Sequence, residues 1–158
     1  MAPMLIRSIS GMRGLISSHL TKEFCINFAN AIDQIIPDGV IMLGRDTRPS
    51  GEELLENVST QLQKCGRTVI VLGIVPTPTI QYMVQNTEAQ GGIVITASHN
   101  PIEWNGFKFI RNDGTFFRPD ECDNLFSIMD ENNFSNHKND MGMIMQDVNA
   151  VQKHIINV

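Results

Sequence analysis

The chain has 158 residues, a length that suits one domain with a substantial core. Hydrophobic residues make up 42% of it and the formal net charge is −5, which argues against a nucleic-acid or anionic-membrane surface because both need a basic face. No apolar run approaches membrane-spanning length, and the first residues lack the basic start and apolar core of a signal peptide. The three cysteines are widely spaced without a Cys-x-x-Cys pair, so we expect reduced thiols. Together these observations predict a cytoplasmic protein that contacts neither nucleic acid nor a membrane.

The first half of the chain alternates strands with helices. Residues 4–9 predict a short apolar strand that ends in a loop over residues 10–14. Thr21 is suited to cap a helix that carries apolar residues on one face and stops at Pro37. Residues 40–43 then predict a compact second strand.

A second helix follows the loop over residues 44–49. Ser50 and Glu53 have the spacing of a capping box, which predicts that Ser50 is the N-cap residue. Gly66 suits a left-handed stop at the other end of this helix. The β-branched residues 68–72 predict the next strand.

Two more strands are expected in the second half. Thr77 precedes a proline and predicts the cap of a short helix, and residues 92–96 predict an apolar strand. Asn105-Gly106 is a tight-turn signal, after which residues 107–110 predict a further strand. Pro119 then opens a helix, with acidic residues favouring its amino end.

The end of the chain turns polar and Asn-rich over residues 132–142, which predicts a loop. Residues 148–158 predict a helix that stops without a cap or a glycine. We therefore expect this chain to be the first part of a longer protein.

This order of elements predicts a three-layer α/β/α sandwich around a mostly parallel, four-stranded mixed sheet. One strand, residues 107–110, follows its predecessor too closely for a helical crossover, so we expect it to be antiparallel to the others. Loops that leave parallel strands converge on one edge of such a sheet, where open α/β folds bind ligands.

The clearest signal of chemistry is Thr96-Ala97-Ser98-His99-Asn100-Pro101, directly after the apolar strand. Pro101 keeps this stretch from becoming a helix, so the serine hydroxyl is expected in a loop at the sheet edge. Other loops at that edge bring in cations, and the following strand adds one more, in a protein that is acidic overall. These cations are Arg13, Arg45, Arg48 and Lys108. A hydroxyl among fixed cations favours phosphate chemistry.

Three other kinds of site fit the sequence poorly. The serine lacks the flanking glycines of a nucleophile elbow, which argues against a serine hydrolase. The loop over residues 44–50 has no Gly-Lys-[Ser/Thr] ending, which argues against a P-loop. The four histidines have no ligand spacing with one another or with cysteines, which argues against a zinc site.

The serine hexapeptide closely resembles the phosphoserine loop of the α-D-phosphohexomutases, the phosphoglucomutase/phosphomannomutase family. Three further stretches are similar to that family in the same order. These are Ile9-Ser10-Gly11-Met12-Arg13-Gly14, Gly44-Arg45-Asp46-Thr47-Arg48-Pro49-Ser50 and Asn105-Gly106-Phe107-Lys108.

The resemblance implies a role for each matched residue. Ser98 would carry the phosphoryl group, pass it to a hexose phosphate to form a hexose bisphosphate, and take the other phosphoryl group back. It would also be this chain's one ligand to Mg²⁺. Three more catalytic residues are implied: Arg13 and Lys108 would serve proton movement or stabilise charge, and His99 would lie near the sugar hydroxyl and the phosphate. Asn100, Arg45 and Arg48 would bind substrate or phosphate. For the two arginines, the sequence itself favours ion pairs that brace the loops over direct contact with a ligand.

The family's Asp-Gly-Asp-x-Asp-Arg metal loop is absent from this chain. We therefore expect residues 1–140 to be the family's first domain and residues 141–158 to begin the connection to a second domain that holds the other Mg²⁺ ligands. Alone, the chain is expected to be inactive. The sugar could be a glucose, mannose or glucosamine phosphate. The alternative is a stand-alone phosphosugar-binding or regulatory module without catalysis.

Overall fold

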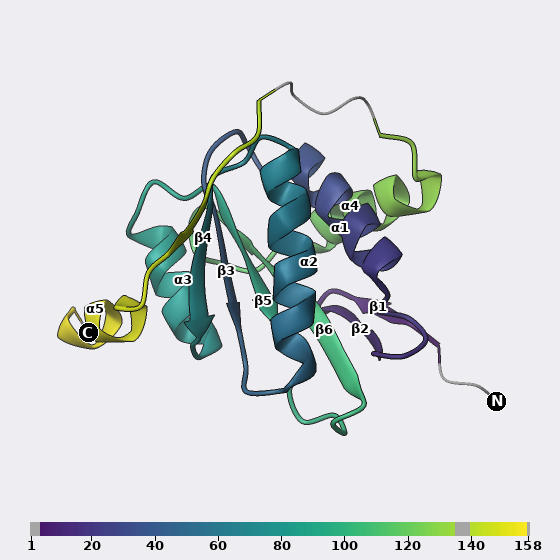
Figure 1. The fold of residues 1–158 in the computed structure, drawn as a ribbon, viewed down its shortest axis with the longest axis horizontal. Coiled ribbons are helices and arrows are strands. Elements are labelled where there is room, and N and C mark those ends of the chain that lie inside the picture. Colours follow the sequence, from purple (N-terminus) through teal and green to yellow (C-terminus); the bar gives the residue numbers. More distant parts are fainter. Residues whose placement is uncertain (1–3, 135–139, 158) are drawn as a thin grey trace.

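A seven-stranded mixed sheet crosses the molecule with helices on both faces (Figure 1). The computed structural model describes residues 4–134 and 140–157. The strands, in their order across the sheet, are β1 (Ile6–Ser8), β2 (Gly11–Leu15), β6 (Trp104–Arg111), β5 (Gly91–Ile95), β3 (Ile41–Arg45), β4 (Val69–Ile74) and β7 (Ile144–Gln146). The helices are α1 (Lys22–Ile35), α2 (Ser50–Lys64), α3 (Thr77–Gln85), α4 (Pro119–Glu131) and α5 (Ala150–Ile156).

The α/β/α class is confirmed, but the strand count of four is too low. Strands β5, β3, β4 and β7 are parallel to one another, and β6 is antiparallel to β5 as expected. Two further strands extend the other edge, because β2 pairs antiparallel with β6 and β1 pairs antiparallel with β2. The residues expected to form the loop 10–14 therefore lie mostly in a strand.

Two glycines allow β2 and β6 to lie side by side. Gly11 has φ +113°, and a Cβ there would lie 2.1 Å from the carbonyl oxygen of Phe107. A Cβ on Gly106 would lie 2.1 Å from the carbonyl oxygen of Met12. The sequence suggested turns at both positions because glycine is typical of turns, but here it permits close approach of two backbones. The turn predicted at Asn105-Gly106 is wrong, since both residues lie within β6.

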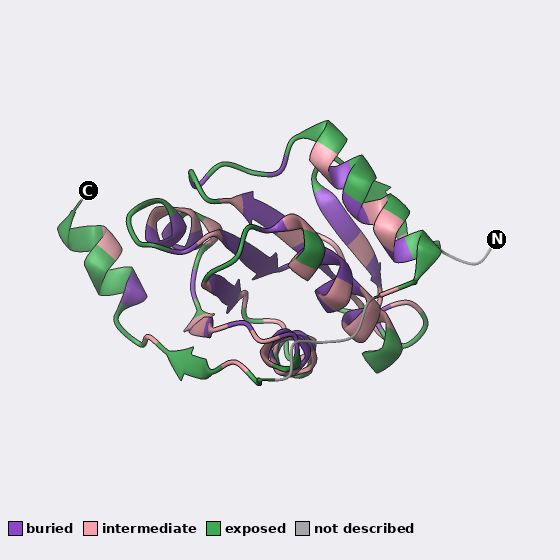
Figure 2. Ribbon diagram, turned by 90° about the horizontal axis from the view of Figure 1, so that it is seen from above, coloured by how far each residue is buried: buried purple, intermediate pink, exposed green. Residues whose placement is uncertain are grey.

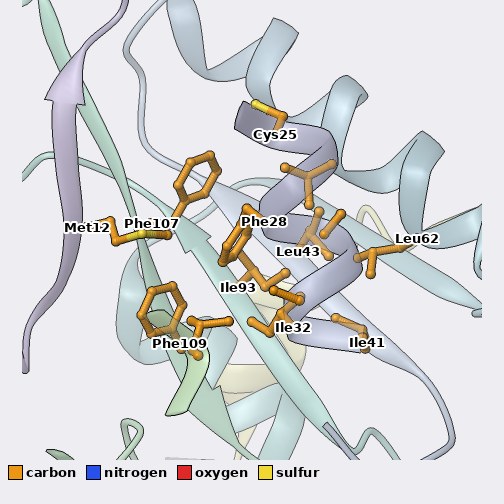
Figure 3. Packing of buried hydrophobic residues seen from close by; sticks show 14 of the residues in the cluster. Met12, Cys25, Phe28, Ile32, Ile41, Leu43, Leu62, Ile93, Phe107 and Phe109 are labelled. Atoms are coloured by element: carbon orange, nitrogen blue, oxygen red, sulfur yellow. The ribbon is translucent and has the colours of Figure 1, made fainter. Parts of the chain in front are cut away.

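Alternate residues of the central strands face two separate cores, as a period of two requires. Ile41 and Leu43 face α1, α2 and α4, whereas Met42 faces α3. On the larger core, Phe28 stacks on Phe107 with their ring centroids 4.6 Å apart (Figure 3). Seen from above, buried residues line the central strands of the sheet, whereas β7 and the outer helix faces are exposed (Figure 2).

The helix ends agree with the sequence in part. The Thr21 cap is confirmed, because its Oγ1 accepts a hydrogen bond from the Phe24 amide. Gly66 follows α2 with φ +90°, which confirms the left-handed stop. The capping box at Ser50 is wrong: Ser50 is the first residue of α2, and its hydroxyl accepts a hydrogen bond from the Asn105 side chain instead. Thr77 is likewise the first residue of α3 rather than its cap.

The last described segment packs on the sheet and on α3. Strand β7 pairs with β4 and was not predicted, because its three residues are exposed and show no apolar alternation. Helix α5 begins at Ala150 and contacts α3, where His154 stacks on Tyr82 with centroids 4.9 Å apart. The polar loop expected over residues 132–142 falls partly outside the described residues.

All three cysteines are free, as the sequence predicted, and all three are buried. Burial raises the pKa of the Cys25 thiol to about 12, with a smaller effect from the charge of Glu53. Cys25 is therefore a packing residue that stays protonated near neutral pH. Among the described residues, no helix combines the length and apolar character needed to span a bilayer.

Replacing Gly106 by alanine tests the close approach of β2 and β6. The new methyl group would overlap the Met12 carbonyl oxygen, so G106A is expected to lower the free energy of unfolding by about 3 kcal/mol, measured by urea denaturation. The matched control is G51A, whose new Cβ meets only the flexible Arg45 side chain at 3.1 Å, and it is expected to change stability by less than about 1 kcal/mol. Equal effects of the two substitutions would contradict this account.

Candidate functional site

The loops after β3 and β5 leave the same edge of the sheet, as expected for neighbouring parallel strands (Figure 1). Arg45 lies opposite Ile95 in the register, and the Asp46 amide donates a hydrogen bond to the Ile95 carbonyl at 3.1 Å. The loop that carries Arg48 and the loop that carries Ser98 are thus adjacent from their first residues.

Ser98 is exposed and has an unusual backbone. Its φ is +54°, in the left-handed region that side chains other than glycine seldom adopt. Its amide donates a hydrogen bond to the Thr96 hydroxyl at 3.1 Å. Strained residues of this kind cluster at ligand-binding and catalytic sites.

Ser98 lines a pocket of about 190 Å³ together with Arg13 and Lys108. The register explains why these residues meet. Arg13 lies opposite Gly106, two residues before Lys108, so the two cationic residues share one face of the β2–β6 pair. The pocket's other lining residues are Ser10, Met12, Thr96, Ala97 and Phe107.

Neither cation in this pocket is neutralised by a neighbour. Among residues 4–134 and 140–157, no hydrogen bond or ion pair is found for the side chain of Arg13 or Lys108. The Lys108 ammonium instead lies 5.7 Å from the centre of the Phe116 ring, a cation–π contact. An exposed hydroxyl and two uncompensated positive charges make the pocket suited to an anionic group.

Arg48 has a different environment. Its Nη atoms donate to four backbone carbonyls at 2.6–3.0 Å, and its Nε lies 3.4 Å from the Asp46 carboxylate. A guanidinium has five N–H donors, so every donor of Arg48 has a protein partner. The carbonyls belong to Ser98, Asn100, Pro101 and Trp104.

Arg45 also donates to backbone carbonyls, those of Asp46 and Arg48, at 3.2 and 3.4 Å. These contacts favour the bracing role for both arginines. Phosphate binding by Arg45 and Arg48 stays a prediction that the geometry does not favour.

His99 and Asn100 do not line the pocket of Arg13 and Lys108. His99 is exposed in the turn after Ser98. Asn100 lines an open groove on the other side of Ser98, and its amide donates to the Ala97 carbonyl at 3.1 Å. The structure therefore brings together three of the four residues expected to be catalytic.

Sequence reasoning missed two residues at this site. Ser10 lines the pocket from the turn before β2, and its place in a matched stretch was the only signal for it. Phe116 supports Lys108 from the segment after β6, where nothing in the sequence pairs the two.

The described residues hold no cluster of three or more His, Cys, Asp or Glu side chains that could bind a metal ion. Near Ser98, the Asp46 carboxylate is occupied by Thr96 and by Arg48. This stretch by itself does not supply the six oxygen ligands that Mg²⁺ prefers.

Comparisons with known proteins agree on one family. Residues 5–136 match the model of the family described as phosphoglucomutase/phosphomannomutase, alpha/beta/alpha domain I. A probable phosphoglucosamine mutase of Methanosphaera stadtmanae is 39% identical over 129 residues, which are 80% of this chain and 28% of that protein. A phosphoglucosamine mutase of Methanococcus aeolicus is 36% identical over 148 residues, 91% of this chain and 31% of that protein. The chain thus spans less than a third of the length of these relatives.

Solved structures give the same answer. A putative phosphomannomutase from Thermus thermophilus superposes with a TM-score of 0.79 at 26% identity, covering 93% of this chain and 34% of that one. A phosphoglucomutase/phosphomannomutase family protein from Burkholderia thailandensis shares the fold with a TM-score of 0.76 at 24% identity, covering 94% and 35% of the two chains. The match over residues 5–136 and the shared fold show that this chain belongs to the phosphoglucomutase/phosphomannomutase family and carries its α/β/α domain I.

Proposed function

We propose that this chain is the phosphoserine-bearing domain of a hexose phosphate mutase, with Ser98 as the phosphoryl carrier. The observation that supports it most directly is the pocket in which the exposed Ser98 meets two unneutralised cations, Arg13 and Lys108. Phosphoryl transfer depends mainly on positioning and on offsetting the charge of the phosphoryl oxygens, and this pocket is suited to both.

The transfer would run in two steps that conserve the phosphoryl groups. A hydroxyl oxygen of the hexose phosphate attacks the phosphorus on phosphorylated Ser98, the bond from phosphorus to Oγ breaks, and the hydroxyl proton passes through a base to Oγ. The resulting bisphosphate reorients, Oγ attacks its other phosphoryl group, and the bond from that phosphorus to the sugar oxygen breaks. The proton of Oγ passes back to this sugar oxygen, which leaves the isomeric monophosphate and phosphorylated Ser98. Arg13 and Lys108 would stabilise the charge of the transferring group, and the exposed His99 is the candidate to accept the proton.

The names of the relatives bear on the choice of substrate. Several of them are named phosphoglucosamine mutase, which favours a glucosamine phosphate over a glucose or mannose phosphate as substrate. Bound Mg²⁺ would offset phosphate charge, with a Ser98 oxygen or its phosphate as the one ligand from this chain and the others from a second domain. We also propose that the enzyme works in the cytoplasm.

The identity of the carrier can be tested by intact-mass measurement. The complete gene product, treated with glucose 1,6-bisphosphate, is expected to gain one phosphoryl group, and S98A is expected to gain none. S127A is the matched control, because Ser127 is an exposed serine on α4, and it is expected to be phosphorylated like the wild type. Incorporation into S98A, or none into the wild type, would refute the assignment.

The two cations can be tested by their effect on the same phosphorylation. R13Q and K108Q are each expected to slow phosphorylation of Ser98 by about 100-fold, since each removes one positive charge from the transferring group. R111Q is the control: Arg111 ends β6 at the opposite edge of the sheet and is paired with Asp113 and Glu121. A rate for R13Q and K108Q equal to that of R111Q would show that the pocket does not act on the phosphoryl group.

The 158-residue chain alone is expected to have almost no mutase activity, because it provides too few ligands for Mg²⁺. A coupled assay with glucosamine 1-phosphate should give a turnover at least about 1,000-fold below that of the complete gene product. Comparable turnover would show that one domain is sufficient. Specific binding of the phosphosugar by a complete gene product that shows no turnover would favour the alternative of a binding or regulatory module.

A further inference from the structure

We propose that Thr96 and Asp46, together with Arg48, are positioning residues that hold Ser98 in its left-handed conformation and aim its hydroxyl into the cationic pocket. This inference rests on the proposed function, since it assigns the groups that orient the phosphoryl carrier. None of the three is proposed to touch the reacting atoms.

The direction of each hydrogen bond supports a chain of contacts that ends on Ser98. The Thr96 hydroxyl donates to Asp46 Oδ2 at 2.8 Å, and because it has one proton it can only accept at its other positions. The Ser98 amide donates to the Thr96 hydroxyl oxygen at 3.1 Å. By accepting the one hydroxyl proton of Thr96, the Asp46 carboxylate leaves the Thr96 oxygen available to accept the hydrogen bond from the Ser98 amide.

Asp46 is itself held on both oxygens. The Arg48 amide donates to Oδ1 at 3.0 Å, and the Arg48 Nε lies 3.4 Å from Oδ2. The side chain of Arg48 is only 12% exposed, so this pair is weakly screened by solvent. Arg48 thus fixes the orientation of the carboxylate, so that Oδ2 can accept the hydrogen bond from the Thr96 hydroxyl.

The guanidinium of Arg48 then determines the path of the loop. Its four bonds reach the carbonyls of Ser98, Asn100, Pro101 and Trp104, so the chain from residue 98 to residue 104 wraps around one planar cation. A lysine at this position has no planar fork and could not satisfy these partners in the same geometry.

The network reaches Ser98 from two sides: Thr96 lines the pocket of Arg13 and Lys108, whereas Asp46 and Arg48 line an open groove next to it. Ser98 is the one residue that lines both the pocket of Arg13 and Lys108 and the open groove that contains Asp46 and Arg48. A φ of +54° is disfavoured for serine, so bonds on both its amide and its carbonyl are needed to maintain it. Because Thr96 holds the amide and Arg48 holds the carbonyl, the backbone of Ser98 is fixed while its side chain is left free to act in the pocket.

Thr96→Val and Thr96→Ser separate the hydroxyl from the shape of the side chain. Valine keeps the size of threonine but neither donates to Asp46 nor accepts from Ser98, whereas serine retains both bonds. In the 158-residue chain, T96V is expected to raise the amide hydrogen-exchange rate of Ser98 at least tenfold by NMR, with the amides of β5 unchanged, and T96S is expected to restore protection.

Arg67 provides a matched control for Arg48. It also pairs with a carboxylate, that of Asp33, and donates to four carbonyls, but these lie at the end of α1 and in the segment just after it. R48K is expected to expose the Ser98 amide to exchange as T96V does. R67K is expected to lower the thermal midpoint while leaving Ser98 exchange unchanged.

The same variants in the complete gene product test the link to the reaction. T96V is expected to slow phosphorylation of Ser98 about tenfold without changing the bisphosphate concentration that gives half the maximal rate, and T96S is expected to recover the rate. Unchanged exchange in T96V, or changed exchange with an unchanged rate, would overturn the inference. A wild-type protein that is never phosphorylated, but whose Ser98 exchange responds as described, would refute the proposed function and leave the structural role of Thr96 and Asp46 intact.

Discussion

The site depends on how closely two antiparallel backbones approach each other. Strand β2 carries Arg13 and strand β6 carries Lys108, and the pocket exists because these strands are neighbours. Gly11 and Gly106 leave no side-chain atoms between them, and a Cβ at either position would lie 2.1 Å from a carbonyl oxygen of the other strand. The sheet can therefore extend past β6 and bring a second cation to the edge where Ser98 emerges.

Two arginines with the same pattern of partners secure opposite ends of the domain. Arg48 pairs with Asp46 and donates to carbonyls of the Ser98 loop. Arg67 pairs with Asp33 and donates to carbonyls at the end of α1 and in the segment just after it. The side chains of Arg48 and Arg67 are 12% and 3% exposed, so both guanidinium groups are largely buried. The bonds of Arg48 fix the loop at the candidate site, and those of Arg67 stabilise the C-terminal end of α1, which covers the larger core.

The sequence predicted an element correctly where its local chemistry and its apolar periodicity agree. Thr21 is followed by a regular apolar face, and its cap was predicted correctly. Ser98, Arg13 and Lys108 were brought together correctly because neighbouring elements carry them to one sheet edge. Glycine was the main source of error. The sequence does not distinguish a glycine that makes a turn from one that, like Gly11 and Gly106, allows close approach of a neighbouring backbone. The Ser50 hydroxyl was misassigned because its partner, Asn105, lies 55 residues away.

The aromatic ring of Phe116 affects the charge available in the pocket differently from a carboxylate in its place. A ring face attracts the Lys108 ammonium through its quadrupole but carries no net charge of its own. The lysine is thereby restrained while its full positive charge remains available to whatever enters. An aspartate there would form an ion pair and would repel an incoming phosphate, so an apolar neighbour keeps this side of the domain attractive to anions even though the chain as a whole is acidic.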